Sequence, residues 1–354
     1  MNIFSFLINP KYFNNKIVII IKYLIIIILL LKLKFITIKN SSLSIYSNKW
    51  VIITAFNPPF PSLINLLNIT EDWKIVVISN NNKIDKKWKE LNYSNRIIYL
   101  TLKEQMKLGY NILKFLSFNS YSRKNIGYLF AIQHGAKEIL EINEDIVISD
   151  LNSFNLKFNK IYFGIRNDSK MINPYIHFRE KHIWPRGFRL SDIGSQCYNK
   201  FYTLDSKHLK LTPLIYQGLI NRVPDIDTIF QKTTISNNEY NFSYIEPFIY
   251  FPGNFIPINS KNTKYLYALF PFLVLPSTLS EETSDILRGY ILQYFAWRFN
   301  GCVVYISSQN YKTIKNVSKK TNFIEEKNLL YNLDNYLDAL TFYNIKKIII
   351  RHLI

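Results

Sequence analysis

The chain has 354 residues, of which 48% are hydrophobic, and a formal net charge of +19 from 44 lysines and arginines against 25 acids. Such a charge ordinarily suggests a nucleic-acid or anionic-membrane partner. Here the lysines are dispersed and no recognition helix, zinc spacing or aromatic ladder accompanies them, which argues against nucleic acid. With only two cysteines, Cys197 and Cys302, the chain has neither a disulfide framework nor a CxxC metal site; the two either pair or remain free thiols.

The amino-terminal segment is strongly apolar. Residues 17–31 carry one charge, Lys22, and apolar residues continue to Ile38 between further lysines. A bilayer needs about 20 apolar residues, and lysine stems extend the usable length, so we predict an uncleaved signal anchor. A cleaved signal peptide or a buried pair of strands is the alternative. Lysines on both sides leave the orientation undecided by charge.

Strands and helices alternate after this segment. Apolar runs predict strands at 50–56, 74–79 and 97–100 and helices at 61–67 and 103–113. Strand, helix and strand with short links favour a parallel α/β sheet. The chain has no GxGxxG and no GxxxxGK[ST], and its 10 glycines provide no phosphate cradle, which argues against dinucleotide oxidoreductases and P-loop NTPases.

The stretch from Ser120 to Asp145 joins a basic cluster to a helix and an acidic strand end. Apolar residues spaced by three and four define one face of a helix that begins at Arg123, Lys124 and Asn125 and closes at Gly135. Cations at a helix start oppose its dipole unless an anion lies nearby. A diphosphate would supply that anion, so these three residues are candidate ligands of phosphate and ribose.

Acidic residues follow at the carboxyl end of a short predicted strand, 139–142. Open α/β sheets bind ligands at such ends. We predict that Glu141, Glu144 and Asp145 hold a divalent metal, with Mn²⁺ expected, because a metal ion neutralises a diphosphate leaving group without a glycine-rich loop. Asn143 lies among them and brings no charge, which should weaken the metal site.

Two further acids, Asp225 and Asp227, lie one residue apart in a loop. Alternate residues of an extended segment point to the same side, so both carboxylates can face one site. Either is a candidate base that deprotonates an acceptor hydroxyl, as an inverting transfer requires. The alternative is a helix N-cap by one aspartate and a surface partner for the other.

An aromatic and basic loop begins at His182. Trp184 suits stacking on a uracil or sugar ring, and Arg186 suits pairing with a phosphate; a packed loop with an exposed arginine is the alternative. Further along, Asp285 and Arg288 are spaced for an ion pair on one helix face. The aromatic run that follows, 290–297, is predicted to be core.

Several segments together resemble one known family. They are RKNIGYLFAIQHGAK at Arg123, WVIITAFNPPFPSL at Trp50, HIWPRGF at His182, YQGLINRVPDIDTIF at Tyr216, FPGNFIPINSKNT at Phe251 and DILRGY at Asp285. These blocks, from about Trp50 to Tyr290, resemble the STELLO-like family of probable Golgi glycosyltransferases. The chain departs from the family pattern where D-x-D-D becomes Glu141 to Glu144, where NSQNT carries Lys261, and where DIWRG carries Leu287.

The resemblance implies a GT-A-like α/β fold in the Golgi lumen, anchored by one amino-terminal helix. It implies a nucleotide-sugar donor, with a UDP-sugar as candidate, a glycan acceptor, and substrate-binding roles for Asp285 and Arg288. The alternative, which Asn143 favours, is a non-catalytic relative in complex with another glycan-synthesising enzyme. The expected division is a cytosolic tail at 1–15, an anchor at 16–38, a stem at 39–49, a transferase-like domain at 50–320 and a helical tail at 321–354.

Overall fold

A computed structural model shows the fold of the chain. The described residues are 45–59, 62–70, 72–90, 96–149, 154, 160–165, 171–180, 182–189, 192, 200–205, 211–233, 239–250, 252, 254–307, 310–312, 323–333 and 335. The expected tail and anchor, most of the stem, and Cys197 lie outside them, as does most of the expected carboxyl-terminal tail. Over the described residues, no helix combines the length and apolarity needed to cross a bilayer.

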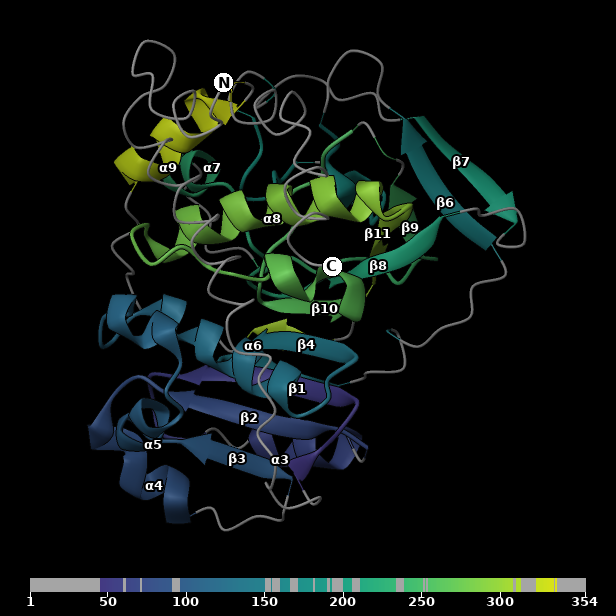
Figure 1. Ribbon diagram of the computed structural model, residues 1–354. Helices are drawn as coiled ribbons and strands as arrows, with labels where there is room; N and C mark the ends of the chain where they lie inside the picture. Colours follow the sequence, from purple (N-terminus) through teal and green to yellow (C-terminus); the bar gives the residue numbers. More distant parts are fainter. Residues whose placement is uncertain are drawn as a thin grey trace, which may run out of the picture.

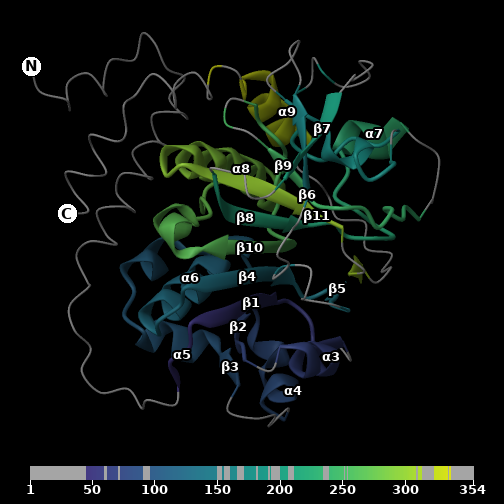
Figure 2. The same ribbon diagram turned by 90° about the vertical axis from the view of Figure 1, so that its right-hand side faces the viewer.

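One ten-stranded sheet runs through the described structure (Figures 1 and 2). In spatial order its strands are β3 (Ile97–Leu100), β2 (Lys74–Ser79), β1 (Lys49–Ala55), β4 (Glu138–Asn143), β10 (Asn262–Leu266), β8 (Thr212–Gly218), β11 (Gly301–Ile306), β9 (Phe248–Tyr250), β6 (Lys160–Ile165) and β7 (Lys200–Asp205). A separate ribbon pairs β12 (Tyr311–Lys312) with β5 (Ile146–Val147). The predicted strands at 50–56, 74–79, 97–100 and 139–142 are thus confirmed.

The direction of the strands places most carboxyl ends at one edge. Strands β3, β2, β1 and β4 are parallel. Strand β10 runs antiparallel to both β4 and β8, and β8 is parallel to β11. The carboxyl ends of β1, β2, β4, β8 and β11 therefore share an edge with the amino end of β10. A large, mostly parallel sheet flanked by helices fits the expected GT-A-like fold.

Helices cover both faces of the sheet. They are α3 (Ser62–Ile69), α4 (Asp85–Glu90), α5 (Leu102–Lys107), α6 (Lys124–Gln133), α7 (Thr228–Thr233), α8 (Glu281–Arg298) and α9 (Phe323–Tyr331). Figure 2 shows α3 and α4 on one face of the parallel strands and α5 and α6 on the other. The alternation in β1 separates two cores, since Trp50 and Ile52 pack on the α6 side and Val51 and Ile53 on the α3 side.

Helix α6 lies unusually close to the sheet because it carries a glycine at the contact. A Cβ atom added to Gly127 would lie 2.7 Å from Cγ2 of Ile52 and 3.2 Å from Cγ1 of Ile78. The helix ends where predicted, because Gly135 takes the left-handed conformation at φ +88°. This close packing sets the depth at which the first residues of α6 lie.

Short 3₁₀ helices make up several links. They are η2 (Asn82–Ile84), η3 (Asn111–Phe115), η4 (Tyr121–Arg123), η6 (Pro174–Ile176) and η9 (Tyr267–Phe272). The single helix predicted over 103–113 is wrong. Thr101 caps α5 with Glu104 in a capping box, but the helix stops at Lys107 because Gly109 adopts φ +66° before η3 begins.

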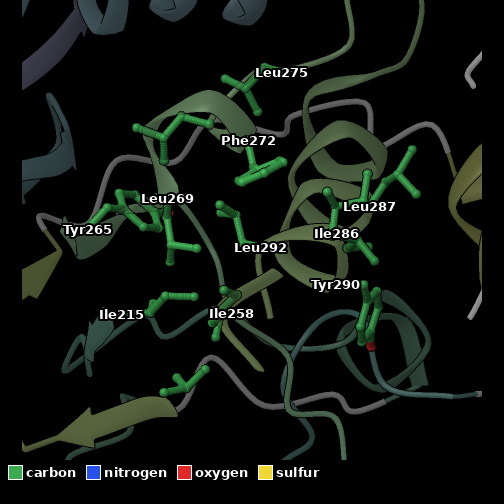
Figure 3. Packing of buried hydrophobic residues seen from close by; sticks show 14 of the residues in the cluster. Ile215, Ile258, Tyr265, Leu269, Phe272, Leu275, Ile286, Leu287, Tyr290 and Leu292 are labelled. Carbon is green, nitrogen blue, oxygen red and sulfur yellow. The ribbon is translucent and has the colours of Figure 1, made fainter. Parts of the chain in front are cut away.

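Helix α8 forms the centre of the larger core. Figure 3 shows Leu292 of α8 beside Phe272 of η9, with Tyr265 of β10 on the same side of the helix, and all three belong to the larger core. Tyr290 is 2% exposed, in agreement with the prediction that the aromatic run is core. Burying each such side chain contributes about 1.5–3 kcal/mol, so α8 is fixed firmly against the sheet.

Candidate functional site

Glu141 lies in β4 and is fully buried between two cations. Its Oε1 is 3.0 Å from Nζ of Lys124, and Nη1 of Arg288 donates to its Oε2 at 3.0 Å. Burial alone would raise the pKa of Glu141, but the charges of Arg288 and Lys124 outweigh burial and lower it. The carboxylate is therefore held ionised, and α6 and α8 are tied to the sheet through it.

Glu141 belongs to a chain of contacts that closes on itself, here called the polar ring. Arg288 also donates to Asp285 at 2.9 Å, confirming the predicted pair, and Asp285 accepts from the Ser260 backbone N–H at 2.9 Å. The Ser260 hydroxyl bonds to the Tyr121 hydroxyl, which accepts from Lys124 at 3.1 Å. The polar ring thus consists of Lys124, Tyr121, Ser260, Asp285, Arg288 and Glu141, all buried.

The charges of the polar ring balance, with two cations against two carboxylates. Burial raises the pKa of Asp285, Arg288 opposes the rise and Glu141 adds to it, giving a pKa of about 6. Arg288 keeps its charge firmly, because the neighbouring Glu141 and tyrosines raise its pKa well above the usual value despite burial. Asp285 is thus the member of this ring that titrates near neutral pH.

The other two predicted metal ligands lie elsewhere. Glu144 accepts hydrogen bonds from the backbone N–H groups of Phe56 and Asn57, at 2.9 and 3.1 Å, and from the Asn57 side chain. Asp145 forms an ion pair with Lys312 of β12 at 3.1 Å. Glu141 faces α6 while Glu144 caps the end of β1, so the structure does not bring these carboxylates together.

This arrangement does not fit a resident divalent metal. Within the described ranges, no three His, Cys, Asp or Glu side chains converge as metal ligands. One or two carboxylates together with substrate phosphates can hold Mg²⁺ or Mn²⁺, but the oxygens of Glu141 already face two cations and those of Glu144 face N–H donors. Asn143 does not substitute, because its Oδ1 accepts from Lys124 at 3.0 Å.

Arg123, the first of the predicted phosphate ligands, is 1% exposed. Its Nε donates to Oε1 of Gln105 at 3.0 Å, and its guanidinium lies 5.4 Å from the centre of the Phe118 ring. No carboxylate pairs with it among the described residues, and burial lowers its pKa. By contrast, Asn125 has a structural role, since its amide donates to and accepts from the Leu275 backbone.

Two buried polar side chains at the same edge have no hydrogen-bond partner within the described part of the chain. The Thr54 hydroxyl and both amide atoms of Asn80 make no hydrogen bond, although the residues are 3% and 2% exposed. Leaving such groups unpaired costs about 1–3 kcal/mol each. Thr54 pairs in register with Asn143, the partner of Lys124, and Asn80 follows β2 directly. These atoms are a ready set of donors and acceptors for a ligand.

Sequence reasoning did not single out Thr54 or Asn80. The available signal was their position: each is a polar residue at the carboxyl end of an apolar strand, on the face that carries Ile52 or Ile78. That alternation identifies the face of the sheet on which Thr54 and Asn80 lie. Only the structure shows that no described neighbour forms a hydrogen bond with their side chains. Gln105 was missed for a similar reason, because its partners Ser79, Leu100 and Arg123 come from three separate elements.

Asp225 and Asp227 have different hydrogen-bond partners, although the charge of Arg186 acts on both. The Asp225 carboxylate accepts from Nε of Arg186 at 3.0 Å and forms an ion pair with Lys261. Burial would raise its pKa, but these two cations lower the pKa well below the usual value, so it is a weak base. Asp227 accepts from the N–H groups of Ile229 and Phe230 at the start of α7.

The loop after His182 is packed. Trp184 is 8% exposed and meets Phe188 edge to face, with ring centres 4.9 Å apart, so its ring is not presented to solvent. Arg186 bonds to Thr228 as well as Asp225. Lys261 precedes the amino end of β10, so this cluster lies at the same edge of the sheet as Asn143.

Comparison with known proteins identifies the family. No family model matches the chain. It is 31% identical over 317 residues, 85% of its length, to Probable glycosyltransferase STELLO1 of Arabidopsis thaliana, and 32% identical over 276 residues, 73% of its length, to Probable glycosyltransferase STELLO2 of the same plant. The chain belongs to the STELLO-like family. This STELLO-like chain spans 40% and 35% of the length of those relatives.

Proposed function

We propose that this STELLO-like chain is a glycosyltransferase that binds the nucleotide of a sugar-nucleotide donor at the carboxyl ends of β1, β2 and β4. The relatives STELLO1 and STELLO2, each named a probable glycosyltransferase, support the reaction class. The location of the nucleotide site rests on Asn80. Within the described residues its buried side-chain amide has one donor and one acceptor without a partner. A nucleobase edge presents the complementary acceptor and donor side by side.

The cations at the start of α6 support a diphosphate in the same place. Gln105 links Arg123 to the end of β2, since it donates to the Ser79 carbonyl at 2.8 Å and accepts from Arg123. Lys124 reaches the end of β4 through Asn143. A nucleoside diphosphate between these strand ends would meet Asn80 and Thr54 with its base and sugar and the cations with its phosphates. The transferred sugar would then go to a glycan acceptor.

The test is binding of uridine diphosphate and other nucleoside diphosphates to the full chain, measured by calorimetry. Replacement of Asn80 by alanine should weaken the preferred nucleotide by about ten-fold, because one hydrogen bond to a buried amide contributes about 1 kcal/mol or more. Asn82→Ala is the matched control, since Asn82 is an exposed neighbour in η2. Equal affinity in both variants would exclude this location.

A second function remains a candidate, a non-catalytic partner of another glycan-synthesising enzyme. It is favoured by Asp225, which two cations hold as a weak base. Under this alternative the chain binds nucleotide sugar but neither hydrolyses nor transfers it, and Asp225→Asn leaves its cellular role intact. A single-pass Golgi membrane location is likewise part of the proposal, and fractionation of the tagged full chain with Golgi membranes tests it.

A further inference from the structure

We propose that the donor diphosphate is taken up by the chain's own cations, Arg123 foremost, and needs no divalent metal ion. This inference rests on the proposed function. It starts from the chemistry of the acids. Each carboxylate that the sequence assigns to a metal already has partners: Glu141 has two cations, Glu144 three N–H donors, and Asp145 the ammonium of Lys312. A metal could recruit them only by displacing the cations of Glu141 and Asp145 and the N–H donors of Glu144.

Arg123 supplies the positive charge that the polar ring cannot. Within the polar ring two cations meet two carboxylates, so Lys124 and Arg288 are already compensated. Arg123 stands outside this balance: among the described residues its hydrogen-bond partners are the neutral Gln105 and, at 3.5 Å, the Ser117 carbonyl. A buried guanidinium without a counter-charge is unfavourable, and an anion that pairs with it relieves that cost.

The surroundings of Arg123 suit a phosphate. Arg123 immediately precedes α6, a helix of ten residues, whose amino end adds a partial positive charge. Its planar fork can donate two hydrogen bonds to one phosphate. Lys124 lies one residue further on and directs its ammonium to Asn143, beside Thr54 in register.

Arg123 contacts an exposed side chain, Phe118. The Phe118 ring lies over the guanidinium and is itself 65% exposed. Asn119, the next residue, has φ 54°, a left-handed conformation that costs some free energy for a non-glycine residue. A ligand that displaces this exposed ring reaches Arg123 without disturbing the sheet or the polar ring.

Calorimetric titration of the full chain with uridine diphosphate, in EDTA and in Mn²⁺, tests the inference. We expect the dissociation constants in the two conditions to agree within about three-fold. Arg123→Gln should weaken binding by about ten-fold or more in both, because a charge-assisted hydrogen bond is lost, and Arg123→Lys should lose less. Lys86→Gln, an exposed lysine of α4, is the charge-matched control and should bind like the wild type.

The outcomes separate the two proposals. Binding that requires Mn²⁺, or an Arg123→Gln variant that folds and binds normally, overturns the metal-free diphosphate site and leaves the nucleotide-sugar function standing. Failure of every nucleoside diphosphate to bind in either condition removes both. Far-UV circular dichroism establishes that each variant is folded, and Arg123→Lys keeps the test decisive if Arg123→Gln does not fold.

Discussion

At the scale of single residues, Glu141 has the most consequential position. It joins β4, α6 and α8 through two ion pairs in a fully buried setting. A buried pair adds little net stability over apolar packing, but removing one partner leaves an uncompensated charge in the interior. Glu141 therefore matters mainly because its removal would leave buried positive charge without a counter-charge.

Glu141→Gln should lower the free energy of unfolding by about 3–5 kcal/mol, because Lys124 and Arg288 would keep only Asp285 as a counter-charge. Urea denaturation followed by circular dichroism measures this. Asp72→Asn is the control: Asp72 pairs with Lys49 at the surface, with side chains 64% and 30% exposed, and its loss should cost under about 1 kcal/mol. Equal losses of unfolding free energy in the two variants would show that burial does not determine how much these ion pairs contribute to stability.

Asp285 predicts a specific pH dependence. Its pKa in the folded chain, about 6, exceeds its ordinary value of 3.8, so the folded state binds this proton more tightly than the unfolded state. The stability it contributes is fully present below pH 3.8 and is lost as the pH rises through 6. Asp285→Asn should gain roughly 3 kcal/mol relative to wild type between pH 4 and 7. A difference in unfolding free energy that stays constant with pH would contradict this assignment.

Residue roles followed from the sequence only where partners are local. The pair of Asp285 with Arg288, three residues apart, and the cap of α7 by Asp227 both follow from helix geometry. The bond from Arg288 to Glu141 spans 147 residues and depends on how α8 crosses the sheet. No local sequence pattern predicts that crossing, so the sequence alone left Glu141 available as a metal ligand.

At the scale of elements, α6 shows how packing positions charge. Its apolar face and its end at Gly135 were predictable from spacing. Its distance from the sheet was not, because that depends on Gly127 meeting Ile52 and Ile78 of two different strands. The break of the predicted 103–113 helix at Gly109 was likewise missed, since a lone glycine in an apolar pattern gives only a weak signal.

Gly127→Ala should destabilise the chain by about 1–3 kcal/mol although alanine is the better helix former, because the new methyl group would overlap Ile52. Thermal and urea unfolding of the variant provide the measurement. The same change should weaken nucleotide binding, since a lifted α6 withdraws Arg123 and Lys124 from the strand ends. A stabilised variant, as helix propensity alone predicts, would mean that the helix can move away freely.

At the scale of the whole molecule, the first half of the sheet was predictable and the second was not. Strands β1 to β4 are apolar runs joined by short helical links, a pattern typical of parallel sheets. Strand β10 enters between β4 and β8 with neighbours far away in the sequence. Its antiparallel direction places Ser260 and Lys261 at the ligand edge, which strand periodicity alone does not reveal.

Because β10 continues the sheet without a gap, the two halves should unfold together. Tryptophan fluorescence reports on Trp50, Trp73 and Trp88 in the first half and on Trp184 and Trp297 in the second, while circular dichroism reports on the whole chain. We expect one urea transition with coincident midpoints. Two separated transitions would indicate that the halves are independent domains.

The polar ring lies where β4 meets β10, and its two cations and two carboxylates balance. An anion that binds nearby therefore changes the electrostatic potential at every member of the ring. Negative charge near Lys124 should make Asp285 a stronger proton acceptor, and its pKa of about 6 makes that response measurable. Nucleotide association at pH 6 to 7 should consequently draw a fraction of a proton from the medium. Repeating the titration in buffers of different ionisation enthalpy would reveal this uptake as a buffer-dependent heat, which Asp285→Asn should abolish.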